Sequence, residues 1–412
     1  MSKPTGPIPP YFSADDRGFL CIGGKAVDAL IAQAGGQTPL FIYDVGVIRQ
    51  RVADLRAAMP DALAIHYAIK ANSYAPLLSA MAGIVDGFDV ASAGELQMAL
   101  DAGMHAAEIS FAGPGKRDVE LEAAINAGAT LNLESENEAR RAMLIGERLG
   151  ITPRLAIRVN PSFDLKGSGM RMGGGAKPFG IDAERVPTLV REICSAGAEF
   201  RGFHIFAGSQ ALDADAIIET QSATISLGRQ LSDDAGVEPP LVNIGGGLGV
   251  PYFAGDKAVD IARIGNALTK NNLFNDMAES GIKFACELGR WLVAESGVYL
   301  STIVDRKISH GETFLICDGG LHHQLAASGN FGTVVRRNYP VAIASKFNQE
   351  VEEEANIVGP LCTPLDRLGD NVELPKAEVG DVVAVFLAGA YGKSASPSAF
   401  LGHPEAAELL LN

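Results

Sequence analysis

The amino-acid sequence predicts an α/β protein that combines a (β/α)8 TIM barrel with a C-terminal β-barrel or β-sandwich domain. Eight short runs have the apolar, β-branched character of buried strands, and the stretches between them have helical spacing and end in glycine. Eight such units over roughly 225 residues match the strand count and length of a closed barrel. The expected strands cover residues 64–70, 87–92, 108–113, 130–135, 154–160, 200–208, 241–247 and 283–290. A doubly wound open sheet is the alternative, because periodicity does not distinguish a closed sheet from an open one.

The character of the sequence changes after residue 290. Runs such as 298–309 and 372–392 are rich in strand-forming and turn residues and have little helical periodicity. A chain of 412 residues is also too long for one ordinary domain. We therefore expect three parts: residues 1–45, whose strands join the β domain; residues 46–290, which form the barrel; and residues 291–412, which form the β domain.

The composition excludes several classes of protein. The chain is 47% hydrophobic and 20% charged, which is typical of a globular fold. A net charge of −15 without a cluster of basic residues argues against a nucleic-acid partner. No apolar run approaches the ~18 residues of a membrane helix, and the start MSKPTGPIPPYF does not look like a signal peptide. Five scattered cysteines without a CxxC pattern suggest reduced thiols and no metal site. We expect a cytoplasmic enzyme that acts on small molecules.

Charged residues and glycines follow nearly every predicted strand at the same end. Active sites of barrels form at the C-terminal ends of the strands, so this pattern predicts a site there. Lys70 ends an apolar strand, where its amine is a candidate for Schiff-base formation, although a lysine also extends to solvent from such positions. Residues 245–247 are three glycines that offer N–H groups to a phosphate or form an ordinary turn. Glu287 and Arg290 form an ion pair or contact a charged cofactor.

Nine motifs occur in the same order as in a known family of decarboxylases. They are HYAIKANSYAPLL, FDVASAGEL, FAGPGK, RVNP, NIGGGLG, ELGR, CDGGLHH, GPLCTPLD and GAYG. From about residue 38 onwards the chain therefore resembles the ornithine, diaminopimelate and arginine decarboxylases, which use pyridoxal 5′-phosphate on an alanine-racemase-like barrel. GPLCTPLD and the tail SPSAFLGHP resemble two branches most. One is the butirosin-pathway decarboxylase, which acts on glutamate tethered to a carrier protein, and the other is the decarboxylase found beside exosortase systems.

The resemblance implies a role for each motif residue. Lys70 would hold pyridoxal phosphate as a Schiff base, and Cys362 would reach in from the partner subunit of a homodimer to protonate the carbanion carbon. Glu287 would pair with the pyridine nitrogen and keep it protonated, which favours loss of carbon dioxide over racemisation. The other implied cofactor-binding residues are Asp89, Phe206, Ser209, Gly245, Gly246, Gly247, Gly289, Arg290 and Tyr391.

Two positions depart from the family pattern. Phe206 stands where the family usually has a histidine that stacks on the cofactor ring; an aromatic ring still stacks but does not titrate. His204, two residues earlier, is expected to point the other way. Thr363 follows Cys362 where ornithine and diaminopimelate decarboxylases carry an acid that receives the distal amine of the substrate. Since a hydroxyl cannot pair with a buried ammonium, lysine, ornithine and diaminopimelate are disfavoured as substrates.

We therefore expect a pyridoxal-phosphate-dependent decarboxylase whose substrate lacks a distal ammonium. The substrate would be an α-amino acid or a glutamyl-type group on a carrier protein, and Arg336, Thr363 and Asp366 are the candidate residues to contact it. His322 and His323 are adjacent and point to opposite faces if they lie in a strand, so we expect no metal there. Diaminopimelate decarboxylase is the main alternative. An amino-acid racemase or a non-catalytic homologue is less expected, because the ring acid, the lysine and the cysteine are all present.

Overall fold

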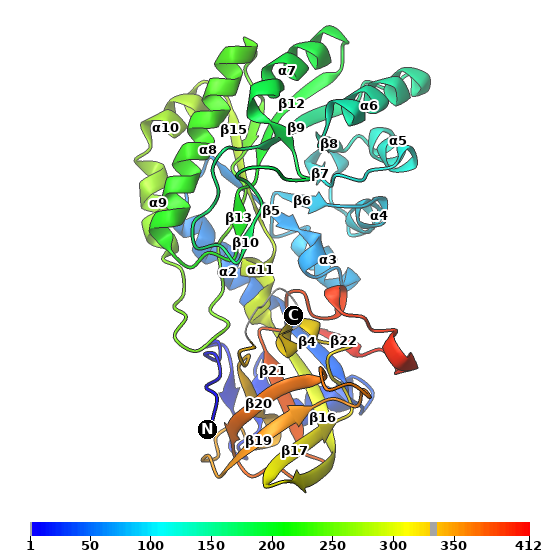
Figure 1. The fold of residues 1–412 in the computed structure, drawn as a ribbon, viewed down its shortest axis with the longest axis vertical. Coiled ribbons are helices and arrows are strands. Elements are labelled where there is room, and N and C mark those ends of the chain that lie inside the picture. The colour runs from blue at the N-terminus through cyan, green and yellow to red at the C-terminus, as the bar shows by residue number, and fades with distance from the viewer. Residues whose placement is uncertain (1, 330–335) are drawn as a thin grey trace. The chain divides into compact units, whose positions relative to one another are not determined.

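The computed structural model describes residues 2–329 and 336–412, and the internal contacts divide the chain into two compact units (Figure 1). The first, which we call the barrel unit, comprises Val52–Val250 and Ala258–Gly289. The second, which we call the β unit, comprises Met1–Arg51, Pro251–Lys257 and Arg290–Asn412. The short segment 251–257 thus lies between two barrel segments in sequence but belongs to the β unit.

The barrel unit is a closed ring of eight parallel strands. In spatial order these are β9 (Arg154–Asn160), β12 (Glu199–Ile205), β14 (Leu241–Asn243), β15 (Lys283–Leu288), β5 (Leu63–Ala68), β6 (Gly87–Val90), β7 (Ile109–Phe111) and β8 (Thr130–Leu133). Pairing of β8 with β9 closes the ring. The predicted closed barrel is therefore confirmed, and the open-sheet alternative is wrong. Two smaller pairings join this unit: β11 (Ile181–Asp182) with β9, and β10 (Met170–Arg171) with β13 (Gly208–Ser209).

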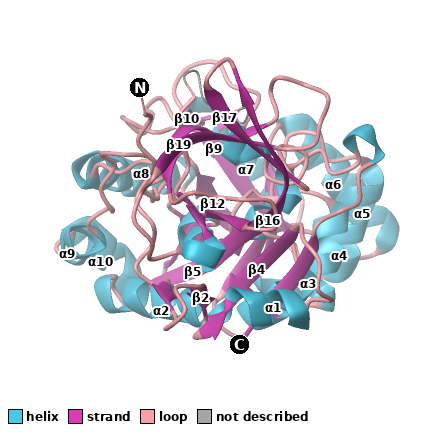
Figure 2. Ribbon diagram, turned by 90° about the horizontal axis from the view of Figure 1, so that it is seen from below, coloured by secondary structure: helices cyan, strands magenta, loops and turns pink. Residues whose placement is uncertain are grey.

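Helices form an outer ring around these strands (Figure 2). They are α3 (Ala75–Met81), α4 (Ala93–Asp101), α5 (Asp118–Ala127), α6 (Glu136–Leu149), α7 (Val186–Ser195), α8 (Ala214–Ala235), α9 (Ile261–Thr269) and α10 (Asn272–Glu279), and α2 (Val45–Ala58) leads into the unit. Local sequence sets where several of them begin and end. The hydroxyls of Ser92 and Ser135 accept N–H groups in the first turns of α4 and α6, and Gly150 and Gly236 end α6 and α8 in the left-handed conformation.

The β unit contains a mixed eight-stranded sheet. Its strands are β4 (Leu40–Asp44), β16 (Gly297–Ser309), β17 (Glu312–Cys317), β18 (Val341–Ile343), β19 (Glu353–Val358), β20 (Arg367–Leu374), β21 (Val382–Phe386) and β22 (Ala407–Leu411). The N-terminal segment contributes β4, which pairs with β16 and β22. By contrast, β2 (Leu20–Ile22) pairs with β1 (Ser13–Ala14) and β3 (Lys25–Ala26) in a separate small sheet. Two short helices, α1 (Val27–Gln33) and α11 (Arg290–Val293), complete the unit.

An apolar core joins the small sheet of the β unit to its large sheet. Leu20 and Ile22 of β2 pack in one cluster with Leu40 of β4, Val298 of β16 and Phe386 of β21, and none of these side chains is exposed. Burial of such side chains contributes roughly 1.5–3 kcal/mol each. No helix in the part of the chain that the structure describes is long and apolar enough to cross a membrane.

Candidate active site

Lys70 lies just beyond the C-terminal end of β5, on the single turn Ile69–Ala71. Its side chain is exposed, whereas Ile69 and Ala71 on either side are buried and hold the turn in place. Gly289, which follows β15, lets this strand end approach the turn closely, because an added Cβ would lie 2.9 Å from the Cβ of Ala71. A larger residue at position 289 would therefore displace the turn that carries the amine.

Two imidazole–carboxylate pairs lie close to this strand end, and His66, Asp89 and His204 are buried whereas Glu287 is partly exposed. Nε2 of His204 in β12 lies 3.0 Å from Oε2 of Glu287 in β15, and Nδ1 of His66 in β5 lies 3.6 Å from Oδ1 of Asp89 in β6. In the parallel register, His66 stands directly opposite Glu287. Within the described residues, neither oxygen of Asp89 and neither ring nitrogen of His204 makes a well-directed hydrogen bond. Because a buried polar group without a partner costs about 1–3 kcal/mol, this surface is suited to a polar ligand.

The electrostatics keep a negative charge at Glu287. Burial acts to raise the pKa of this carboxyl group, but His204, and then Lys70 and Arg158, outweigh burial and lower it. For His66, burial acts to lower the pKa, while the contact with Asp89 and the charges of Asp89 and Glu287 raise it above the ordinary value. An ionised carboxylate beside a reactive amine suits a ligand that carries a cationic ring nitrogen.

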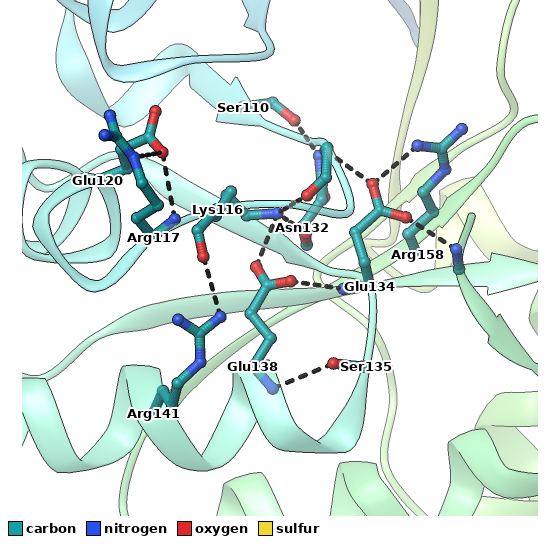
Figure 3. Close-up of polar contacts among 12 residues, drawn as sticks. Ser110, Lys116, Arg117, Glu120, Asn132, Glu134, Ser135, Glu138, Arg141 and Arg158 are labelled. Atoms are coloured by element: carbon teal, nitrogen blue, oxygen red, sulfur yellow. Dashed lines mark hydrogen bonds and ion pairs between the residues drawn. The ribbon is translucent and has the colours of Figure 1, made fainter. Parts of the chain in front are cut away.

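Further buried charges fix the loops around this end of the barrel (Figure 3). Glu134, directly after β8, lies 2.8 Å from Nη1 of Arg158 and accepts the backbone N–H of Gly113 at 2.7 Å. Nζ of Lys116 lies 2.7 Å from Oε1 of Glu138 at the start of α6. These pairs connect the loop after β7 to β8, β9 and α6. Arg158 is therefore engaged by Glu134, and among the described residues His204 is the ion-pair partner of Glu287.

Close packing and backbone conformation require glycine in the segment 245–247. An added Cβ at Gly246 would lie only 2.0 Å from the carbonyl oxygen of Glu287, and Gly245 and Gly247 have φ angles of 73° and 105°. The N–H of Gly245 donates to Oδ1 of Asn243 at 2.9 Å. Among the described residues, the N–H groups of Gly246 and Gly247 have no backbone acceptor. They remain available to an anion such as a phosphate.

Phe206 and His204 lie at the end of β12 in a way that corrects one prediction. Phe206 is half-buried, and its Cδ2 atom would be 3.2 Å from a Cβ at Gly245, so its ring packs on the glycine run. The expectation that His204 points the other way was wrong. Side chains two residues apart in a strand share a face, and His204 lies against Glu287. His66 was not singled out from the sequence, and His204 was considered only for ring stacking; the available signal for both was a histidine within an otherwise apolar strand. Ser209, in β13, is half-buried.

In the β unit, Arg290 begins α11 and is surrounded by aromatic side chains. Its Nη1 donates a hydrogen bond of 3.1 Å to the hydroxyl of Tyr252, and its Cζ lies 4.6 Å from the ring centre of Tyr391. Burial acts to lower the pKa of Arg290, but the neighbouring tyrosines raise it, so the group stays charged. A guanidinium framed by phenols is a suitable contact for a phosphate. Tyr252, on the segment 251–257, was not among the residues predicted from the sequence.

Cys362 lies exposed on the loop between β19 and β20. Asp366 fixes this loop, because its carboxylate accepts the backbone N–H of Leu361 at 2.8 Å and that of Leu321 at 2.6 Å. Burial raises the pKa of Asp366, against the lowering effect of these two bonds. The hydroxyl of Thr363 accepts a long bond of 3.4 Å from the N–H of Leu365. The loop thus presents a thiol and a neutral hydroxyl, while its acid is used internally.

Arg336, the third candidate for a substrate contact, lies in the same unit. Its Nη2 donates to the carbonyl oxygen of Arg367 at 2.6 Å, and its side chain is half-buried. Burial lowers its pKa. No group of three or more His, Cys, Asp or Glu side chains suited to a metal ion occurs in the described part of the chain.

Comparison with known proteins decides the family. Residues 45–294 match the family model described as "Pyridoxal-dependent decarboxylase, pyridoxal binding domain". The chain belongs to this family. It is 37% identical to the L-glutamyl-[BtrI acyl-carrier protein] decarboxylase of Niallia circulans, over 91% of this chain and 89% of that protein. It is 33% identical to the diaminopimelate decarboxylase of Aquifex aeolicus, over 98% and 92% of the two chains.

A solved structure shows the same fold in a member of this decarboxylase family. The diaminopimelate decarboxylase of Helicobacter pylori complexed with L-lysine superimposes with a TM-score of 0.81 at 29% identity, over 91% of this chain and 92% of that one. The predicted family, enzyme class and cofactor are therefore confirmed. The chain is a pyridoxal-phosphate-dependent carboxy-lyase.

The residues of the barrel unit fit this cofactor. Asp89 has two buried carboxylate oxygens with unmet hydrogen-bonding capacity, and Glu287 offers an ionised carboxylate. Gly246 and Gly247 offer backbone N–H groups, and Lys70 offers an exposed amine. These groups match, in kind, the aldehyde, ring nitrogen and phosphate of pyridoxal phosphate.

Proposed function

We propose that this decarboxylase acts on an α-amino acid, free or joined to a carrier protein, whose distal group is not an ammonium. The main support for this proposal is the composition of the loop that contains Cys362. Thr363 is neutral, and the only acid in residues 360–366, Asp366, already accepts two backbone N–H groups. A distal ammonium placed here would find no open carboxylate in this loop, and leaving a buried charge unpaired costs several kcal/mol. The 37% identity to a decarboxylase of a glutamyl carrier-protein conjugate supports a glutamyl-type group.

We assign the chemical roles as follows. Lys70 is the covalent attachment point of the cofactor, which its position beyond β5 supports. When bound, pyridoxal phosphate accepts the electrons that loss of carbon dioxide leaves on the α-carbon. Glu287 balances the charge of the ring nitrogen, and Cys362 donates a proton to the α-carbon. The remaining proposed cofactor contacts are Asp89, Phe206, Ser209, Gly245, Gly246, Gly247 and Gly289 in the barrel unit, and Arg290 and Tyr391 in the β unit.

We also propose a homodimer with shared active sites, in which Cys362 of one subunit serves the lysine of the other. Subunits that carry Lys70→Ala and subunits that carry Cys362→Ala are each expected to be inactive. Mixing them should restore activity in hybrid dimers, because one of the two sites then has both groups intact. If labelled subunits exchange and activity stays at zero, the shared-site arrangement is wrong.

A carrier protein as partner must overcome an unfavourable charge. Carrier proteins are usually acidic, and this chain has a net charge of −15. Arg367 and Lys393 do not form an open basic surface, since they pair with Asp370 at 2.6 Å and Glu408 at 3.0 Å. Docking of a carrier would therefore depend on the tethered group more than on long-range attraction. The five free cysteines support a cytoplasmic location for this reaction.

Release of carbon dioxide from a panel of substrates tests the proposal. The panel comprises glutamate, a γ-glutamyl thioester on a carrier protein or on N-acetylcysteamine, and the amines diaminopimelate, ornithine and lysine. We expect the highest kcat/KM for a substrate without a distal ammonium. Diaminopimelate decarboxylase is the second candidate, favoured by the fold shared with the lysine-bound Helicobacter pylori enzyme. Efficient turnover of diaminopimelate by the unmodified enzyme would establish it instead.

A further inference from the structure

His204 is a buried ionisable side chain for which the motifs and the roles assigned above give no task. It lies in β12, is 2% exposed, and places Nε2 at 3.0 Å from Oε2 of Glu287. Neither of its ring nitrogens makes a well-directed hydrogen bond within the described residues. The ring of His204 therefore lies against Glu287, the carboxylate proposed above to balance the charge of the cofactor's ring nitrogen.

The other charged groups that face Glu287 are engaged elsewhere. Arg158 in β9 is paired with Glu134 at 2.8 Å, and His66 in β5 turns towards Asp89 at 3.6 Å. Lys70 after β5 acts on Glu287 through its charge but is assigned to the cofactor. His204 is thus the residue whose ring contacts the carboxylate, and it does so at Oε2. Within the described residues, no hydrogen bond to the other oxygen, Oε1, is observed, so we assign this oxygen to the ligand.

We propose that His204 is a positioning residue, which holds Oε2 of Glu287 so that Oε1 meets the ring nitrogen of the cofactor; this inference rests on the role proposed above for Glu287. A glutamate side chain has three rotatable bonds, and a contact at one oxygen restricts them. The imidazole also stabilises the ionised form of the carboxylate, because burial alone would favour the protonated one. Partners that orient a ligating side chain typically contribute about 10–100-fold to affinity in metal sites, and we expect the same range here.

The test compares His204→Leu, His204→Gln and Glu287→Gln in the full-length protein. The readouts are the dissociation constant of pyridoxal phosphate and the pH dependence of the bound cofactor's absorbance. His204→Leu should weaken cofactor binding by about 10–100-fold. It should also move the acid-side spectral transition to higher pH, because a largely enclosed Glu287 without its partner protonates more readily. His204→Gln keeps an N–H donor and should recover most of the loss.

A matched control separates positioning from lost stability. Asn356→Leu removes a buried amide of the β unit, which bonds to Glu312 at 3.1 Å, and it should lower the Tm without moving the spectral transition. If His204→Leu behaves like Asn356→Leu, His204 is structural and the inference is wrong. If Glu287→Gln also leaves affinity and spectrum unchanged, the proposed role of Glu287 fails first. A shift with Glu287→Gln but none with His204→Leu overturns only the role of His204.

Discussion

Gly246→Ala is the sharpest steric test of the site. The added Cβ would lie 2.0 Å from the carbonyl oxygen of Glu287 and 3.2 Å from its carbonyl carbon. Non-bonded Cβ atoms essentially never come within 3.0 Å of another heavy atom, so the glycine run and the end of β15 must separate by about 1 Å. The same movement displaces both the N–H groups offered to the phosphate and the backbone that carries the Glu287 carboxylate.

The expected effects follow from this displacement. Overpacking of this kind costs about 1–3 kcal/mol, which lowers the Tm by about 2–12 °C for a unit of this size. A misplacement of about 1 Å at a catalytic group reduces activity roughly 100-fold. Pyridoxal phosphate should also bind more weakly, because two of its proposed N–H donors move.

Thermal unfolding, cofactor titration and single-turnover release of carbon dioxide measure these effects. Gly94→Ala is the matched control: it lies near the start of α4, where an added Cβ would be 3.7 Å from the hydroxyl of Ser92, an ordinary contact. This control should keep full activity and gain up to about 1 kcal/mol of stability, because alanine favours helix more than glycine does. If Gly246→Ala keeps wild-type cofactor affinity and activity, the glycine run is a turn that does not contribute to the site.

Three other perturbations test separate parts of the reasoning. Borohydride reduction followed by peptide mapping should place the cofactor on Lys70, and Lys70→Ala should abolish the label; label on a different lysine refutes the assignment. Thr363→Glu should raise kcat/KM for diaminopimelate relative to glutamyl substrates, since it supplies the acid that an ammonium requires; an unchanged ratio argues that position 363 does not face the substrate's distal end. Burial, His323 and His403 lower the pKa of His322 to about 4, below the ordinary 6.5, so the unfolded chain takes up a proton first as the pH falls. Wild-type stability should therefore decline from about pH 6.5 towards pH 4. The urea midpoint of His322→Leu should decline less over the same pH range. Equal declines in the two proteins would show that His322 is not the group responsible.

The sequence by itself determined the barrel, the family and the charged residues and glycines that follow the barrel strands. Most positions of the buried parallel strands are apolar, and several helices carry their own caps, so these features are local and can be predicted from the sequence. Lys70, residues 245–247 and Glu287 were predicted as site residues from one rule, that active-site residues stand at the C-terminal ends of barrel strands. Thr363 was readable as well, because it directly follows the motif cysteine.

The sequence pattern did not predict three details of the fold. The strand predicted over 64–70 ends at Ala68, and Lys70 lies on the turn that follows. The apolar segment around Leu20–Ile22 forms a small sheet of its own with β1 and β3, because its partners are set by packing against β4 and not by its own pattern. Tyr252 is a loop residue by sequence, yet the segment 251–257 folds with the β unit and meets Arg290.

Only the tertiary structure decided which polar groups act together. His204 and Glu287 are separated by 83 positions, and they meet because β12 and β15 lie one strand apart in the closed sheet. Asp366 was predicted as a substrate contact from its motif, but its partners, the N–H groups of Leu321 and Leu361, come from two separate loops. A side chain's chemistry depends on what faces it, and that is set by strand register and loop packing over distances that no local pattern spans.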